Sequence, residues 1–303
     1  MSSQSVLFDA PGPKARARHR ILAVVGAVVI LLAVVFALWK LGEKGNLDAD
    51  KWAPFLTAEI WTQYLIPGLI NTLKAAAISV VLAGIFGLLF GMGRLSSFAP
   101  LRWFCSIVVE FFRSVPVLIM MIAAFYLFVF NGVFLDEINP LAAVVTGLTL
   151  YNGSVVAELL RSGVGSLPRG QSEAGLAIGL TRGQTLRGIQ LPQAITAMTP
   201  ALLGQLVVVL KDTALGQIIT YPELLTTFSQ IGSYKSNPVP ALIVIAVIFI
   251  LINYALTSAA GAWQKRLRRR GRAVVGAAPG AAVLAAAEDV EAPDEVQAGR
   301  DQP

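Results

Sequence analysis

Charged side chains are scarce in this chain of 303 residues. Asp, Glu, Lys and Arg together make up only 14% of it, whereas 55% of the residues are hydrophobic. A typical soluble domain contains about 25% charged residues. The composition therefore excludes a soluble enzyme and indicates a protein that crosses a membrane several times.

Residues that build catalytic and metal centres are nearly absent as well. The sequence has one cysteine, Cys105, and one histidine, His19. It therefore contains no internal disulfide, no C-x-x-C or H-E-x-x-H motif and no histidine cluster, and we expect neither catalytic residues nor a protein-bound metal. The phosphate-binding motif G-x-x-x-x-G-K-[ST] is also missing, so the chain should bind no ATP or other cofactor itself.

Long uncharged segments are what the sequence does contain. Each is long enough for a transmembrane helix of roughly 20 residues, so the sequence predicts an all-α, polytopic membrane bundle. The first is not read as a signal peptide, because it is too long and no cleavage site follows it. The six segments are 21–39, 75–93, 114–131, 138–157, 188–210 and 237–262.

Lys and Arg are shared unequally between the segments that connect these helices. With the N-terminus inside, seventeen of them fall in cytoplasmic segments and four in outside segments. This asymmetry predicts that both termini are cytoplasmic. Anionic lipid of the inner leaflet accounts for the net charge of +6, so membrane lipid is an expected partner and nucleic acid is not.

The longest cytoplasmic connector, 161–192, exceeds what a simple link between two helices requires. Ser172 is expected to cap a short helix that starts near Glu173. A tight bend bracketed by Gly179 and Gly183 should follow, and then a second short helix over 184–189 that is ended by Pro192. The sequence therefore predicts a compact helix-turn-helix knob on the cytoplasmic side.

The knob contains Glu-Ala, a third small residue, three residues, Gly, nine residues, Ile, one residue and Leu-Pro. This pattern resembles the signature of the membrane permeases of ABC importers. Gly175 stands where that family usually has alanine, which weakens the helix by up to about 1 kcal/mol. The resemblance implies a coupling helix that docks on a separate ATPase, the alternative being a loop helix that packs only on its own protein. The residues concerned are Glu173, Ala174, Gly175, Gly179, Ile189, Leu191 and Pro192.

Four further motifs are similar to those of permeases for polar amino acids such as histidine, glutamate and glutamine. They resemble F-R-x-x-P-x-L, A-E-x-x-R-x-G, P-x-G-Q and L-K-D-T-S-L, the last with alanine in place of serine. The similarity implies a five-helix type I core in a bacterial inner membrane, preceded by one extra helix. The motifs lie at 112–118, 157–163, 168–171 and 210–215.

The predicted organisation and partners follow from this resemblance. We expect an ABC ATPase subunit that uses ATP and Mg, a second permease subunit that is a homologue or this chain itself, an extracytoplasmic amino acid-binding protein, and an amino acid substrate. The segments are a disordered N-terminus, the extra helix, an extracytoplasmic connector, the permease domain, and a basic anchor with a disordered cytoplasmic tail. They span 1–20, 21–39, 40–67, 68–263 and 264–303.

Charged groups within a membrane need partners, and each is a candidate site. Two pairs spaced three residues apart, Glu110 with Arg113 and Glu158 with Arg161, are expected to fix helix packing rather than to contact substrate. A zwitterionic amino acid could instead meet Lys211 and Asp212, although these residues could equally cap a helix at the outer interface. Polar residues near mid-membrane are expected to line the same path, namely Asn152 and Gln205.

Three alternatives differ in mechanism. An ABC importer for another solute would keep the coupling knob and change only the substrate. A secondary transporter or channel would work without an ATPase, which the knob argues against. A membrane enzyme would require a nucleophile, base or metal constellation, which a single histidine does not supply.

Overall fold

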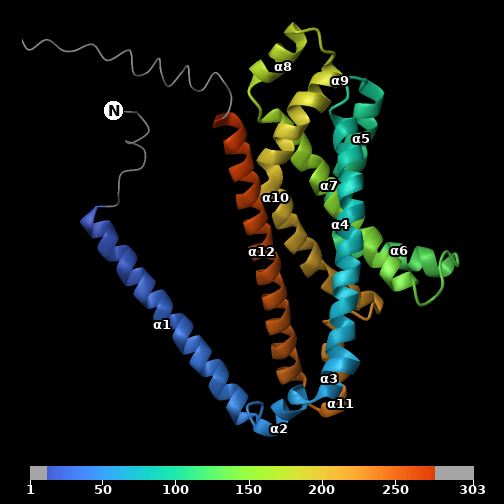
Figure 1. Ribbon diagram of the computed structural model, residues 1–303. Coiled ribbons are helices and arrows are strands. Elements are labelled where there is room, and N and C mark those ends of the chain that lie inside the picture. The colour runs from blue at the N-terminus through green and yellow to red at the C-terminus, as the bar shows by residue number, and fades with distance from the viewer. Residues whose placement is uncertain (1–11, 277–303) are drawn as a thin grey trace, which may run out of the picture. The chain divides into compact units, whose positions relative to one another are not determined.

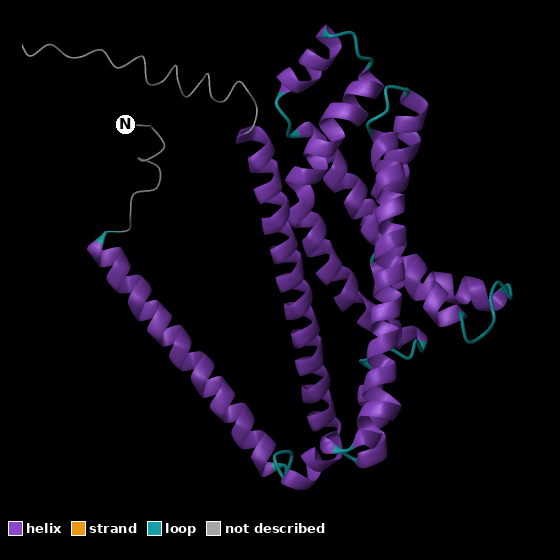
Figure 2. Ribbon diagram, viewed as in Figure 1, coloured by secondary structure: helices purple, strands orange, loops and turns teal. Residues whose placement is uncertain are grey.

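Helices form every regular element that the computed structural model describes (Figures 1 and 2). The description covers residues 12–276, without the side chains of Pro13, Lys235 and residues 265–276. Of the stretches predicted as a disordered N-terminus, 1–20, and as a basic anchor with a disordered tail, 264–303, residues 1–11 and 277–303 lie outside the description. The described residues contain five helices long and apolar enough to cross a membrane, or six if one bent pair counts as a single span.

The chain divides into two compact units. Unit 1 contains the described residues up to Pro67 together with Thr227–Ile245, and unit 2 contains Gly68–Thr226 and the described residues from Ala246 onward. The extra first helix belongs to unit 1. The elements that carry the predicted sites belong to unit 2.

Unit 1 begins with α1, which extends further than the sequence indicated. The helix starts at Pro13 and not near Ile21, so residues 13–20 are helical rather than disordered. Proline suits the first position of a helix, because an N–H group there would have no partner within the helix. The connector that follows α1 consists of short helical turns. It is hydrogen-bonded to the segment that precedes the last span, since Lys51 Nζ donates to Ser236 O at 3.0 Å. The elements are α1 (Pro13–Glu43), α2 (Ala49–Trp52), a 3₁₀ turn (Ala53–Leu56), α3 (Ala58–Ile60), a π turn (Trp61–Leu65) and α11 (Thr226–Lys235).

Unit 2 is built around α7, which packs against α5, α6 and α10. Its apolar core includes Ala75, Met121, Val144, Leu148 and Val209. The last helix continues past the permease boundary expected at residue 263. The elements are α4 (Ile66–Arg94), α5 (Ala99–Ser114), α6 (Val117–Phe130), α7 (Asn139–Gly165), α8 (Arg169–Ala177), α9 (Arg182–Thr185), α10 (Leu191–Asp212) and α12 (Pro238–Gly276).

Two glycines let α4 approach α7 closely. A side chain at Gly91 would place its Cβ 3.3 Å from Ala157 Cα, and one at Gly87 would place it 2.9 Å from the Gly153 carbonyl oxygen. Small residues at such positions allow helix backbones to pack tightly in a membrane. The close contact holds the charged and polar residues of α4 and α7 against one another.

The third uncharged window, 114–131, forms the single short helix α6, which is bent away from the preceding helix α5. α5 and α6 meet at an angle of 100°, and α6 has only 14 residues, about 21 Å of helix against a hydrocarbon core of about 30 Å. Pro116 causes the break, because it lacks an N–H and leaves Val115 in an extended conformation with ψ 128°. Figure 1 shows α6 running across the direction of α4.

Candidate functional site

The α8–α9 hairpin, residues 169–190, is the knob that the sequence predicted. Glu173, Ala174 and Gly175 lie on α8, which ends in a turn. Gly179 in that turn has φ +85°, a conformation that favours glycine. α9 follows, and a π turn, Leu186–Gln190, joins it to α10.

Three details of the predicted hairpin are wrong. The second helix begins at Arg182, so Gly183 lies within it and does not bound the bend. α8 begins at Arg169, directly after Pro168, so Ser172 lies inside the helix and does not cap it. Pro192 does not end the second helix. The π turn, in which the Leu191 N–H bonds to Leu186 O, widens the helix just before the proline ring, so the hairpin continues into α10 with Ile189 and Leu191 at the junction.

Gly175 has a packing role that the sequence did not reveal. It is buried, and a Cβ there would lie 2.6 Å from Thr185 Cγ2 and 2.7 Å from Thr185 Oγ1. The glycine lets α8 pack directly on α9. In this chain Thr185 occupies the space that a side chain at position 175 would need.

A capping box at the start of α9 fixes the other side of the hairpin. Thr181 Oγ1 accepts the Gln184 N–H at 3.3 Å, and Gln184 Oε1 accepts the Thr181 N–H at 2.8 Å. The signal T-x-x-Q is present in the sequence and was overlooked.

The tip of the hairpin presents apolar side chains outward. Ile178 is 75% exposed, and Leu176 is also exposed. Glu173 and Ala174 lie on the same short helix and are exposed too. Exposed apolar groups rimmed by polar ones are typical of a protein-interaction surface.

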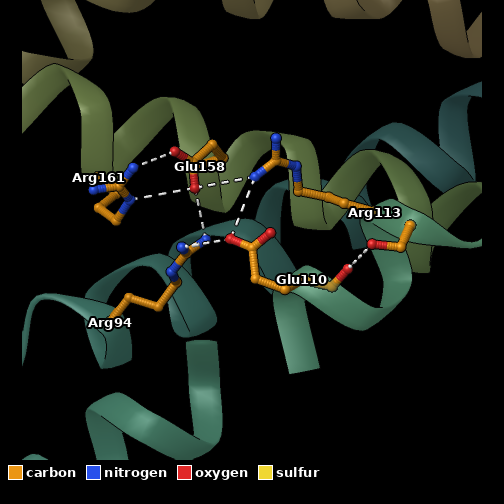
Figure 3. A network of polar contacts seen from close by, with 6 residues as sticks. Arg94, Glu110, Arg113, Glu158 and Arg161 are labelled. Carbon is orange, nitrogen blue, oxygen red and sulfur yellow. Dashed lines mark hydrogen bonds and ion pairs between the residues drawn. The ribbon is translucent and has the colours of Figure 1, made fainter. Parts of the chain in front are cut away.

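Arginine and glutamate side chains from three helices form one charge network, consisting of Arg94, Glu110, Arg113, Glu158 and Arg161 (Figure 3). Arg94 on α4 lies at its centre, with only 6% of its side chain exposed. Its Nη2 donates to Glu110 Oε1 on α5 at 2.9 Å, and its Nη1 donates to Glu158 Oε2 on α7 at 2.7 Å. One guanidinium thus ties three helices together.

Both predicted ion pairs form, and the network joins them. Arg161 Nη2 donates to Glu158 Oε1 at 2.5 Å, and Arg113 Nη1 lies 3.5 Å from Glu110 Oε1. Arg113 also reaches across to Glu158 Oε2 at 3.2 Å. Sequence reasoning missed Arg94 because it ends an uncharged window and was counted as a loop arginine. The sequence did offer one signal for this role of Arg94, because Glu110 and Glu158 are both expected close to the same membrane boundary.

The polar residues predicted near mid-membrane meet as an amide pair. Gln205 Nε2 on α10 donates to Asn152 Oδ1 on α7, and Asn152 Nδ2 donates to Leu148 O at 2.9 Å. Asn152 is fully buried. The pair borders a cavity of about 310 Å³ between α4, α7 and α10, called here the amide cavity, whose other lining includes Ala83, Val156 and Leu206.

Lys211 and Asp212 lie elsewhere, in the last turn of α10, and neither lines the amide cavity. A 3₁₀ turn, Thr213–Ile219, follows them directly. Lys211 is exposed and Asp212 is half-buried. The structure therefore brings together the amide half of the predicted substrate path and separates it from the charged half.

A buried carboxylate just after this 3₁₀ turn escaped the sequence analysis. Glu223 is fully buried, and its two oxygens accept the N–H groups of Leu225 at 2.8 Å and Thr226 at 2.7 Å. Burial raises the pKa of Glu223 to about 7, although these hydrogen bonds act in the opposite direction. Burial, together with the Glu223 charge, also raises the pKa of Tyr221 to about 12.

The Glu223 loop is fastened to α4. Tyr221 donates its hydroxyl proton to Asn71 O at 2.8 Å, and Asn71 Nδ2 donates to Pro222 O at 2.9 Å. The Leu224 N–H donates to Thr72 Oγ1 at 3.0 Å. α4 therefore carries this loop near one end and the charge network at the other.

Known proteins resemble this chain over most of its length. Residues 83–269 match the family described as binding-protein-dependent transport system inner membrane component. The glutamate transport system permease protein GluD of Corynebacterium glutamicum is 48% identical over 233 residues, which cover 77% of this chain and 85% of GluD. The glutamate/aspartate import permease protein GltK of Escherichia coli O6:H1 is 35% identical over 196 residues, covering 63% of this chain and 87% of GltK.

A solved structure agrees with these relatives. The crystal structure of an amino acid ABC transporter with histidines superposes with a TM-score of 0.62 at 27% sequence identity, over 68% of this chain and 95% of that one. The fold is thus that of a type I ABC importer permease with one additional N-terminal helix. The chain belongs to the family of binding-protein-dependent transport system inner membrane components and is a membrane-spanning permease subunit.

Proposed function

We propose that this permease imports polar amino acids and that the solute passes the amide cavity. The observation that carries the proposal is the amide pair of Asn152 and Gln205 beside an otherwise apolar cavity between three helices. A few placed polar groups in an apolar lining are typical of small-molecule sites. Glutamate is the first solute to test, because GluD and GltK are named for its transport.

Lys211 and Asp212 would act at a different point of the path. They are adjacent charges at the end of α10. A zwitterion that approaches them meets a cation for its carboxylate and a carboxylate for its ammonium group. We assign them to capture before the solute reaches the amide pair.

The α8–α9 hairpin would couple the permease to an ABC ATPase subunit. Its apolar tip at Leu176 and Ile178 provides the contact surface, and the glycine turn at Gly179 sets the direction of the tip. In this proposal the ATPase subunit, and not this chain, would bind and hydrolyse ATP with Mg. Motion of the hairpin passes directly into α10, because the two are continuous.

The charge network would keep the bundle intact while it moves. Its five side chains come from α4, α5 and α7 and form ion pairs with one another. We therefore assign Glu110, Arg113, Glu158 and Arg161 to helix packing, as the sequence suggested. A substrate carboxylate would meet guanidinium groups that each already pair with a glutamate.

The working assembly would contain four kinds of component. They are this chain, a second permease that is a homologue or another copy, the ATPase, and an extracytoplasmic amino acid-binding protein. Both termini would face the cytoplasm of a bacterial cell, as the Lys and Arg distribution predicts. Membrane lipid surrounds the complex, and nucleic acid has no part in it.

Ile178→Glu tests the coupling assignment. The matched control is Leu135→Glu, because Leu135 is 73% exposed and Ile178 is 75% exposed, but Leu135 lies outside the hairpin. The tagged chain is purified from mild detergent, co-purifying P-loop ATPase is quantified, and uptake is measured in vesicles. We expect Ile178→Glu to lose the ATPase and uptake, and the control to keep both. Retention of both in Ile178→Glu overturns the assignment.

Competition assays test the substrate class. The complex is reconstituted with its binding protein, and uptake of labelled glutamate is measured against unlabelled glutamate, glutamine, aspartate, histidine, leucine and phosphate. Inhibition by polar amino acids alone supports the proposal. Uptake that no polar amino acid inhibits would show an importer for another solute.

A further inference from the structure

A second, larger cavity lies where the hairpin meets the α4–α5 turn. Its volume is about 860 Å³, and it is called here the arginine cavity. α4, α5, α8 and α9 all contribute to its lining. It is separate from the amide cavity, and the two share no lining residue.

The charged side chains that line this cavity are all positive, and only some of them have partners within the chain. Arg102, Arg182 and Arg187 line it, and no carboxylate does so in the described part of the chain. Arg102 Nη1 donates to Ser96 O at 3.1 Å, which leaves its other donors unused. Arg182 and Arg187 form no ion pair with any residue that the structure describes. The cavity therefore offers guanidinium donors to an anion from outside the chain.

Arg94 also borders the arginine cavity but is not one of these donors. Its guanidinium already bonds to Glu110 and Glu158. Ser97 and Ser172 are also among the residues that line the cavity. Guanidinium and hydroxyl donors together are the groups that proteins use to bind phosphate.

Part of the cavity wall is apolar and includes residues of the α4 span. Leu89, Met92 and Leu101 form part of it. Leu89 precedes the last residue of the α4 span by five positions, which is about 7.5 Å deeper along the helix. Exposed aromatic side chains at Phe98 and Trp103 flank the turn, as is typical of residues at a membrane–water boundary.

We propose that the arginine cavity binds one anionic phospholipid. Its phosphate lies among Arg102, Arg182 and Arg187, and one acyl chain follows the wall formed by Leu89 and Met92. The phosphate alone would suit a free anion equally well, but the apolar wall at the end of a membrane span fits a lipid. A lipid bound there touches both α4 and the α8–α9 hairpin, and so it braces the hairpin against the bundle.

Native mass spectrometry of the purified complex tests this proposal. Phosphatidylglycerol is added, with phosphatidylcholine of the same acyl composition, glycerol 3-phosphate and inorganic phosphate as competitors. The variant is Arg187→Ala, and the matched control is Arg169→Ala, an exposed arginine of α8 that does not line the cavity. Arg187→Lys keeps the charge, and circular dichroism confirms that each variant retains its helices.

We expect phosphatidylglycerol to be retained in preference to phosphatidylcholine and not to be displaced by glycerol 3-phosphate. Arg187→Ala should weaken retention about fivefold, which is the contribution typical of one basic residue facing an anionic lipid. Arg169→Ala should leave retention unchanged, and Arg187→Lys should preserve most of it.

Three results would overturn the lipid assignment. Equal losses in Arg187→Ala and Arg169→Ala would indicate attraction by general surface charge. Displacement by glycerol 3-phosphate or inorganic phosphate would indicate a site for the free anion. Equal retention of the two lipids would show that the arginines do not select charge. Since the readout is lipid binding, its failure leaves the transport proposal untouched.

Discussion

The charge network and the amide pair are two polar clusters in the same bundle, and they differ in charge and in burial: Glu110 is 56% exposed, whereas Asn152 is fully buried. In the network, two carboxylates and three guanidiniums contact one another across α4, α5 and α7. In the amide pair, a single side-chain hydrogen bond joins α7 to α10 beside a cavity. Both clusters border cavities, but the charged groups of the first are paired with one another, whereas the second presents neutral amides to a mostly apolar cavity.

The difference teaches that charge within a membrane is not by itself a sign of substrate contact. Ionised groups in a low-dielectric setting are stabilised only by close partners. Their hydrogen-bonding groups are therefore largely occupied by one another. Neutral amides require fewer partners and can exchange one of them for a ligand. Polar contacts in this chain should therefore divide into those that maintain structure and those that determine transport.

Arg94→Met should have the largest effect on stability. It leaves Glu110 and Glu158 without the guanidinium that joins them, and each hydrogen bond to a charged group typically contributes about 1.5–3 kcal/mol. Arg113→Met is the matched comparison, because that side chain is 36% exposed, and it should cost less than about 1 kcal/mol. Thermal unfolding of the purified complex measures both. Equal losses would mean that burial does not set the strength of the network.

Glu223 differs from both clusters, because it is a buried carboxylate that accepts hydrogen bonds from backbone N–H groups. Its pKa in the folded protein is about 7 against an ordinary 4.5, so the folded state binds the proton more tightly than the unfolded state. The stability that protonation adds is fully present below about pH 4.5 and is lost as pH rises through about 7, on the order of 1–3 kcal/mol.

The melting temperature should accordingly fall between about pH 5 and about pH 8, and Glu223→Gln should flatten that slope. Glu137→Gln, an exposed glutamate with the same chemistry, serves as the control and should leave the slope unchanged. A slope that persists in Glu223→Gln would assign the titration to another group.

Asn152→Leu should impair transport more than stability. Removal of the amide leaves Gln205 unpaired beside the cavity, and we expect KM for uptake to rise about tenfold. Hydrogen bonds between membrane helices contribute only about 0.6 kcal/mol on average, so unfolding should change little. Asn131→Leu, at an exposed amide bonded to Leu127 O, is the control. A large loss of stability with unchanged KM would place the amide pair with the structural contacts.

Thr181→Ala should have the smallest effect. It removes the capping box of α9, which lies exposed on the hairpin, at a cost of about 1 kcal/mol that stays local. Hydrogen exchange of residues 182–185 measures the loss. Thr196→Ala, whose hydroxyl bonds to Pro192 O within α10, is the control and should leave that exchange unchanged. Global destabilisation by Thr181→Ala would show that the hairpin is part of the folding core.

Local motifs in the sequence were sufficient to locate the hairpin. The glycine turn at Gly179 and the family pattern from Glu173 to Pro192 both fall where the sequence placed them. The helix boundaries near Ser172 and Pro192 were predicted wrongly. Neighbouring residues decide whether a capping residue starts a helix and whether a proline ends one. The Pro168 lead-in and the π turn at Leu186–Gln190 are such effects.

Contacts between distant segments were beyond the reach of sequence reasoning. Spacing along one helix predicted the pairs Glu110 with Arg113 and Glu158 with Arg161, since residues three apart share a helix face. Spacing could not show that Arg94, sixteen residues from one glutamate and sixty-four from the other, completes the network. Glu223 was overlooked for the same reason, because only folding buries it.

The sequence alone determined that this protein crosses a membrane, that its elements are helices and that it resembles the permeases of ABC importers, because hydrophobicity and motif spacing are properties of neighbouring residues. The tertiary structure decided which polar groups meet: the five members of the charge network, the amide pair apart from Lys211 and Asp212, and the unpaired arginines behind the hairpin. The physical reason is that a polar group's energy depends on its partners and its burial, and both are set only when distant helices pack together.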